Sequence, residues 1–153
     1  MAGNGRLSPV TAYRFCRTDD VPLLVHAHNA CYAEPAGTRP ITVEDFRRWR
    51  RELDVWCSSC MVAFEGSDPI GVLIAAKRAH ASWIHCIGVR PEHRRRGHAR
   101  HMLESLARKM AILEPDLLLA EVSSENAAAR SLLEACGWSA GDTMVDWLSR
   151  RQK

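Results

Sequence analysis

The sequence predicts an α+β fold with a mixed, mostly antiparallel sheet of six strands flanked by four helices. Two observations carry this prediction. Short runs of alternating or continuous apolar residues, typical of strands, recur along the chain, and apolar residues elsewhere recur at helical spacing. Their order is β-α-α-β-β-β-α-β-α-β, and a short turn joins the second and third strands as an antiparallel hairpin.

The first part of the chain contains one strand and two helices. Residues 12–17 alternate in the manner of a half-buried strand, and residues 18–20 (TDD) supply a cap for a helix that continues to about Tyr32. Residues 34–40 are rich in Pro and Gly and predict a loop. Thr42, with an acid at the third helical position, begins the second helix.

Three strands follow, and a third helix comes after them. Residues 60–65 and 70–76 are apolar runs around the turn at residues 66–69, and residues 82–89 form the next strand. Gly88 lies inside this strand, where a glycine marks a bulge or a close backbone approach. The third helix is indicated by one apolar face: Ala99, Met102, Leu103, Leu106 and Met110.

The last part of the chain predicts a strand, a helix and a final strand. Residues 117–122 (LLLAEV) are typical of a strand buried on both faces, which makes the carboxylate of Glu121 conspicuous. Residues 126–136 form a helix that Gly137 ends, and residues 143–148 form a short sixth strand. We expect one domain over residues 11–149, after a disordered lead-in of residues 1–10 and before a basic tail of residues 150–153.

Composition excludes several classes of protein. The net charge of +3 is too small to indicate a nucleic-acid-binding protein, and no apolar run approaches the roughly 18 residues that span a bilayer. We expect a cytoplasmic protein without a metal. Cys57 and Cys60 have the spacing of a metal or redox pair, but no second pair follows, so we interpret them as buried structural residues.

The strongest functional signal is the basic turn between the strand at 82–89 and the third helix. A helix beginning directly after a strand offers unpaired N–H groups and the positive end of its dipole, and Gly97 and Ala99 leave room for an anion. The turn therefore predicts a pyrophosphate site. Its residues are Arg94, Arg95, Arg96, Gly97, His98 and Ala99.

Two motifs resemble those of the GNAT family of N-acetyltransferases. The first is Arg94-x-x-Gly97-x-Ala99, and the second is Asn126-x-x-Ala129-x-x-Leu132 followed by Gly137-Trp138. The resemblance covers the chain from about residue 12 to 148 and implies acetyl-CoA as co-substrate. It also implies a bulged strand that separates from its neighbour to admit the pantetheine arm. The cofactor-binding residues so implied are Ile87, Gly88, Val89, Arg94, Arg95, Arg96, Gly97, His98, Ala99, Arg100 and Asn126.

The resemblance also implies catalytic candidates. Glu121 stands five residues before Asn126, as the general base does in relatives similar to the ribosomal-protein alanine N-acetyltransferases. The alternative is that Glu121 is a surface-facing residue at the end of the strand or forms a structural ion pair with an arginine. His85 is a second candidate for the base. The usual general acid is a Tyr after the motif Leu, and here that position is Leu133. Candidates to replace it are Tyr13, Tyr32, Ser131 and water.

Several alternatives stay open. The expected product is an acetylated primary amine, either the α-amine of a peptide or protein or that of a small molecule, with Glu34 available to attract a cation. The family's usual final strand is missing, so the chain is alternatively a non-catalytic acyl-CoA-binding domain or the first half of a tandem protein. A homodimer is possible, and a nucleic-acid-binding module based on the arginines is the least favoured alternative.

Overall fold

The computed structural model describes residues 10–33, 39–113, 117–123 and 125–141. The chain divides into two compact units, Met1–Glu121 and Val122–Lys153. The first unit holds the sheet and three α-helices, and the described part of the second holds one α-helix.

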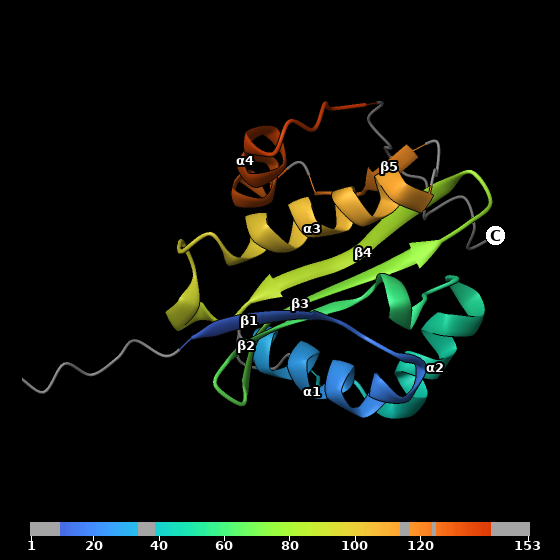
Figure 1. Ribbon diagram of the computed structural model, residues 1–153, viewed down its shortest axis with the longest axis vertical. Coiled ribbons are helices and arrows are strands. Elements are labelled where there is room, and N and C mark those ends of the chain that lie inside the picture. The colour runs from blue at the N-terminus through green and yellow to red at the C-terminus, as the bar shows by residue number, and fades with distance from the viewer. Residues whose placement is uncertain (1–9, 34–38, 114–116, 124, 142–153) are drawn as a thin grey trace, which may run out of the picture. The chain divides into compact units, whose positions relative to one another are not determined.

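A five-stranded sheet in the order β1-β2-β3-β4-β5 organises the first unit (Figure 1). The first four strands pair antiparallel, and β5 pairs parallel with β4, which confirms the mixed, mostly antiparallel sheet. The sixth predicted strand, residues 143–148, lies outside the described residues. The strands are β1 (Thr11–Phe15), β2 (Met61–Glu65), β3 (Asp68–Lys77), β4 (Ala81–Val89) and β5 (Leu117–Ala120).

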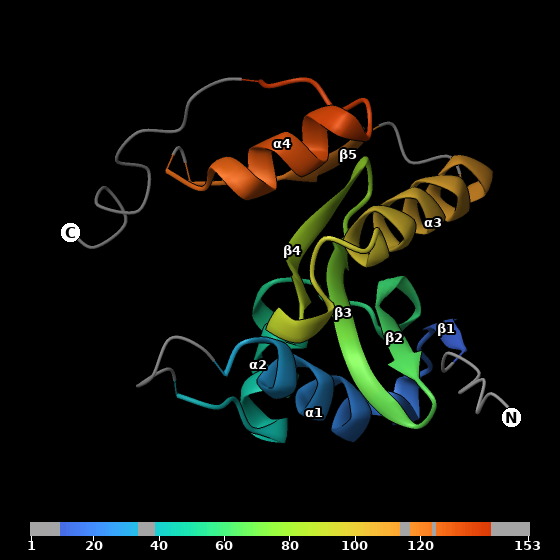
Figure 2. The ribbon, with the colours of Figure 1, turned by 90° about the vertical axis from the view of Figure 1, so that its left-hand side faces the viewer.

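Helices cover both faces of this sheet. Figures 1 and 2 show α1 (Val21–Cys31) and α2 (Val43–Glu52) on one face and α3 (His98–Leu113) on the other. The apolar face predicted for α3 is buried at Met102, Leu103, Leu106 and Met110. Three short 3₁₀ turns that the sequence pattern did not predict are η1 (Thr18–Asp20), η2 (Cys57–Ser59) and η3 (Pro91–His93).

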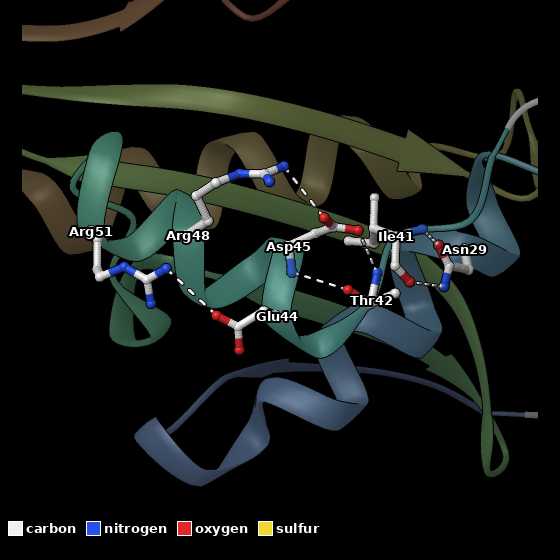
Figure 3. A network of polar contacts seen from close by, with 7 residues as sticks. All are labelled: Asn29, Ile41, Thr42, Glu44, Asp45, Arg48 and Arg51. Carbon is white, nitrogen blue, oxygen red and sulfur yellow. Dashed lines mark hydrogen bonds and ion pairs between the residues drawn. The ribbon is translucent and has the colours of Figure 1, made fainter.

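The start of α2 is fixed by a reciprocal cap, as the sequence predicts. The Asp45 backbone N–H donates to Thr42 Oγ1 (3.1 Å), and the Thr42 N–H donates to the Asp45 carboxylate (2.9 Å). Asn29 of α1 exchanges two hydrogen bonds of 2.9 Å with the backbone of Ile41, the preceding residue (Figure 3). The entry to α2 is therefore tied to α1.

β5 differs from the strand expected at residues 117–122. It is only four residues long, and its burial is partial, with Leu117 57% exposed. Glu121 follows the end of the strand and is exposed. The expectation of a strand buried on both faces around this carboxylate is therefore wrong, and the alternative, a surface-facing residue at the end of the strand, is confirmed. Within the described ranges β5 pairs only with β4, and this pairing ends at Ala120.

The described part of the second unit is the helix α4 (Ala127–Ala135) with both of its predicted ends. The Asn126 side chain caps the N-terminus by accepting from the Ala129 N–H (3.1 Å). Gly137 has a φ of +85° at the C-terminus, and the next N–H, that of Trp138, donates back to Leu133. This is the glycine-ended cap that the sequence indicates.

Cys57 and Cys60 are both buried, and burial raises the pKa of each thiol. The Cys60 Sγ donates to the Trp56 carbonyl. Within the described ranges, no group of three or more His, Cys, Asp and Glu residues is arranged to hold a metal ion. Among the same residues, no helix combines the length and the apolarity that crossing a membrane requires.

Candidate functional site

The site is built around an edge of β4 that β5 leaves open. β4 pairs with β3 through residues 82–89, but β5 accompanies it only to Ile84, which lies opposite Ala120. Beyond that pair, no described strand lies on the β5 side of residues 85–89. The pairing of these two parallel strands therefore ends in the middle of β4.

A bulge in β4 lies directly after the last residue that pairs with β5. Ile84 pairs with Ala75 and Cys86 with the adjacent Ile74, so His85 is the extra residue. The bulge turns the His85 ring toward α2, where it meets the ring of Trp49 edge-on at 4.7 Å. The sequence suggested Gly88 as a bulge or a close approach, and the structure shows the second alternative.

At Gly88 the close approach is made by α1. A Cβ on this residue would lie 2.8 Å from the Tyr32 ring and 3.2 Å from the Cβ of Cys31. Tyr32 uses the space to donate its hydroxyl hydrogen to the Ile87 carbonyl (2.7 Å). Gly88 therefore contributes room for a phenol beside the open edge.

The backbone of the open edge presents two N–H groups. The Arg90 N–H donates to Ile70 (2.8 Å), and because antiparallel pairs alternate, the amides of Ile87 and Val89 point away from β3. Their carbonyls are already engaged, by Tyr32 at Ile87 and by the Arg94 Nε at Val89 (2.9 Å). What faces the opening is a pair of donors at the spacing of an added strand.

The turn that follows leads into the N-terminus of α3. Arg95 has a φ of +61° and Gly97 one of +85°, and no other atom lies within 4 Å of the position of a Cβ on Gly97. The Gly97 carbonyl accepts the first helical bond, from His101 (3.0 Å). The N–H groups of the first turn thus stand at the positive end of the helix dipole, which favours an anion, and the space beside Gly97 is open.

His98 supports this turn with its side chain instead of facing a ligand. Its ring is buried, and Nδ1 shares a hydrogen bond of 2.7 Å with the hydroxyl of Tyr13 in β1. The Tyr13 ring also stacks on His101, with the centroids 3.8 Å apart. Burial, and then the nearby His93, lowers the pKa of His98. Only the backbone of His98 is placed to contact an anion.

The side chains of the remaining predicted cofactor residues differ in the contacts that they already make. Arg94 is turned back onto Val89, and Arg100 pairs with Glu104 (2.8 Å). Arg95 and Arg96 are exposed at the turn. Asn126 caps α4 in the second unit.

Both candidate bases lie where the pairing of β4 and β5 ends. His85 and Glu121 are each the first residue after the last β4–β5 pair. Partial desolvation, and then the nearby His28, lowers the pKa of His85, although part of the residue is exposed to solvent. A lowered pKa keeps this imidazole neutral at pH 7, the state that can accept a proton. The two residues remain alternative bases.

The structure also separates the candidates for the general acid. Tyr32 lies at the open edge, whereas Tyr13 is tied to the start of α3 and Ser131 belongs to α4 of the second unit. Burial raises the pKa of Tyr32, so its hydroxyl stays protonated. Of the two tyrosines, Tyr32 is therefore the one next to the edge donors.

Two residues beside the opening were not foreseen as functional. His28 stacks on Tyr32 (4.6 Å), and Trp49 lies between His28 (5.6 Å) and His85. The i, i+4 spacing of His28 and Tyr32 places them on one face of a helix, but nothing in the sequence indicates that α2 would bring Trp49 to the same place.

Comparison with known proteins agrees with this geometry. The family model described as "Acetyltransferase (GNAT) family" matches residues 21–138. No curated protein sequence matches the chain. Many solved structures do, and those named below share at most 20% identity with it, so they show the fold alone.

One such structure is the ribosomal-protein-S18-alanine N-acetyltransferase from Escherichia coli, with a TM-score of 0.71 and 20% identity over 90% of this chain and 83% of that one. Another is the NatC complex bound to Gag peptide and CoA, with a TM-score of 0.73 and 19% identity over 90% of this chain and 89% of that one. A third is AAC(6')-Iy in complex with a CoA-based bisubstrate analogue, with a TM-score of 0.69 and 14% identity over 89% of this chain and 95% of that one.

The match to the family model extends from the first residue of α1 to the cap of α4 and includes the open edge of β4 and the turn before α3. The chain therefore belongs to the GNAT family of acetyltransferases.

Proposed function

We propose that the protein is an acetyl-CoA-dependent N-acetyltransferase that moves the acetyl group to a primary amine by direct attack in a ternary complex. The observation that carries this proposal is the open edge of β4, where the N–H groups of Ile87 and Val89 lead to the N-terminus of α3. An extended pantetheine arm fits the edge as an added strand, and its diphosphate fits the turn at Gly97.

Acyl transfer from a thioester needs alignment of the substrates and stabilisation of the developing oxyanion. Holding an amine and a thioester in line contributes roughly 7–11 kcal/mol to lowering the barrier, so positioning by the open edge is the largest expected effect. A backbone N–H at this edge is the natural donor to the oxyanion. These roles fall to groups that the fold fixes in place.

The amine must also lose a proton, and His85 and Glu121 are the two groups proposed to take it. The bulge directs His85 toward α1 and α2, and its lowered pKa keeps it neutral, whereas Glu121 is exposed beyond β5. These observations favour His85. A general base adds typically about 10²–10⁴-fold to the rate.

The cofactor site is tested with a matched pair of glycines. Gly97→Glu places a carboxylate where the diphosphate would lie, and we expect the affinity for coenzyme A to fall more than about tenfold in calorimetry. Gly66→Glu is the control, because Gly66 also has a positive φ (+61°) and open space but lies in the β2–β3 turn. Equal affinity in the two variants refutes the proposed position of the diphosphate.

The base is tested by the pH dependence of thiol release. With His85 as base, kcat/KM falls as the pH drops through the lowered pKa of this imidazole, which lies below the usual histidine value of about 6.5. His85→Gln removes that limb while coenzyme A binds normally. Glu121→Gln then leaves the profile unchanged. The reverse pattern assigns the base to Glu121.

A non-catalytic acyl-CoA-binding domain is the second candidate, because Leu133 occupies the position of the Tyr that usually acts as general acid in the family. It predicts coenzyme A binding without thiol release on any amine. The thiolate of coenzyme A is an adequate leaving group without protonation by a general acid, since thiols have pKa values near 8.5. The missing Tyr is therefore compatible with catalysis.

A further inference from the structure

A row of four rings lies along the α1–α2 side of the open edge, and we call it the ring surface. It consists of His28, Tyr32, Trp49 and His85. His28 stacks on Tyr32 at 4.6 Å with the planes 21° apart, and Trp49 meets His28 and His85 edge-on at 5.6 Å and 4.7 Å. Residues from α1, α2 and β4 thus form one continuous, partly exposed aromatic surface.

The ring surface runs beside the place where the acetyl group would be transferred. At one end the Tyr32 hydroxyl bonds the Ile87 carbonyl, and at the other end is His85, the bulge residue. An amine that approaches the β4 edge from the side of α1 and α2 therefore brings its neighbouring groups against these rings. The residue next to the amine is the part of the acceptor that the rings contact.

The surface carries no negative charge in the described part of the chain. Desolvation lowers the pKa of both His28 and His85, so both rings are neutral at pH 7. A cavity of about 160 Å³ continues the surface past His28 and Tyr32, and Arg39 is the charged residue among those that line it.

Two carboxylates in the first turn of the adjoining helix α2 are paired with arginines. Asp45 is held by the α2 cap and by Arg48 (3.3 Å), and Glu44 lies 3.5 Å from Arg51 (Figure 3). Among the described residues of the ring surface and the cavity, a substrate with several ammonium groups would find aromatic faces and one arginine, and no carboxylate to compensate its charge. Glu34, which the sequence suggests as a residue that attracts a cation, lies outside the described residues. An apolar or aromatic group would instead gain by leaving water.

We propose that the acceptor is an amine with a single positive charge, carried directly beside a large apolar or aromatic group, as in the α-amine of a peptide that begins with such a residue. Polycationic acceptors such as aminoglycosides and polyamines are poor substrates. An α-amine has a pKa of about 7.7–8.0, so a neutral imidazole can accept its proton more readily than that of a lysine. This proposal rests on the acetyltransferase function proposed above.

The test compares acceptors on the unmodified protein, with thiol release from acetyl-CoA as readout. The panel is a pair of short peptides that differ only in Phe or Gly at the first position, together with neamine and spermine. We expect kcat/KM for the Phe peptide to exceed that of the others roughly tenfold. Faster turnover of neamine or spermine, or equal turnover of the two peptides, overturns the proposal and leaves acetyl transfer intact.

A variant locates the effect on the ring surface. Trp49→Ala is expected to raise KM for the Phe peptide roughly tenfold with little change in kcat or in coenzyme A affinity. Trp56→Ala is the control, because Trp56 is 52% exposed and lies against Lys77, away from this surface. Trp49→Phe, which keeps a ring, is expected to restore KM and guards against misfolding of the Ala variant.

The two proposals fail in different ways. Coenzyme A binding without thiol release from any acceptor overturns both of them. Turnover of the Phe peptide with the same KM in the Trp49→Ala and Trp56→Ala variants overturns only the role of the ring surface.

Discussion

Gly88 shows how one missing methyl group shapes the site. With a Cβ, the residue would meet the Tyr32 ring at 2.8 Å, closer than side chains normally approach. The Tyr32 hydroxyl would then have to move away from the Ile87 carbonyl, which it now contacts at 2.7 Å. The shape of the open edge therefore depends on the absence of a side chain at Gly88.

We predict that Gly88→Ala lowers the free energy of unfolding by about 1–3 kcal/mol, because the added methyl group overpacks the contact between α1 and β4. Urea denaturation measures the change. Gly141→Ala serves as control, since nothing lies within 4 Å of a Cβ there. Equal stability of the two variants would show that Tyr32 moves aside without cost.

Sequence patterns anticipated which residues matter better than what each one does. The motif predicts His98 at the cofactor turn, but its ring bonds Tyr13, 85 positions earlier in the chain. The apolar run at 117–122 suggests a buried Glu121, yet the strand ends one residue before it. Such outcomes depend on partners that are distant in sequence, and local pattern carries no information about them.

Elements were predicted more securely, because periodicity and caps are local. The capping box at Thr42 is an example, since its two partners are three residues apart. The bulge at His85 is the opposite case. It arises from a change of register between β3 and β4. The sequence pattern had suggested Gly88 as a possible bulge, three residues away from the bulge at His85.

The cap makes a prediction for α2. Thr42→Ala removes the side-chain acceptor for the Asp45 N–H, and we expect a loss of about 1 kcal/mol of stability, whereas Thr42→Ser should retain most of it. Thermal or urea unfolding measures both variants. If the Ala and Ser variants are equally stable, the cap contributes nothing and α2 is held by its packing and by the Asn29–Ile41 pair.

The alternation along β4 makes a second prediction at this scale. The amides of Cys86 and Gly88 face β3 and should exchange slowly with solvent in the free protein. Those of Ile87 and Val89 face the open edge and should become protected only when coenzyme A is added. Amide exchange followed by NMR resolves the four residues, and protection of Ile87 without ligand would mean that the edge is closed.

The order of the strands across the whole sheet follows from a few features of the connections between them. The hairpin turn fixes β2 against β3, and the remaining connections place β1 and β4 on either side of them. The helix between β4 and β5 then allows these two strands to run parallel. The sequence pattern therefore predicts the order of the elements. It does not predict where the pairing of β4 and β5 ends, and only the resemblance to the family implied that these strands leave an opening.

Three histidines give the molecule an expected sensitivity to mild acid. Burial is the first cause of the lowered pKa of His28, His85 and His98. The unfolded chain takes up protons at the usual histidine pKa of about 6.5, whereas the folded protein does so only at lower pH. Stability is therefore fully present above about pH 6.5 and is lost as the pH falls through the lowered folded values.

We predict a lower urea midpoint at about pH 5.5 than at about pH 7.5, since the carboxylates with lowered pKa, such as Asp45 and Glu104, titrate at still lower pH. His28→Gln should reduce the difference between the two midpoints, because one of the protonation sites is gone. His26→Gln on the same helix is the matched control, since His26 is exposed. A midpoint that does not change between these pH values would show that the three rings accept protons in the folded protein as easily as in the unfolded chain.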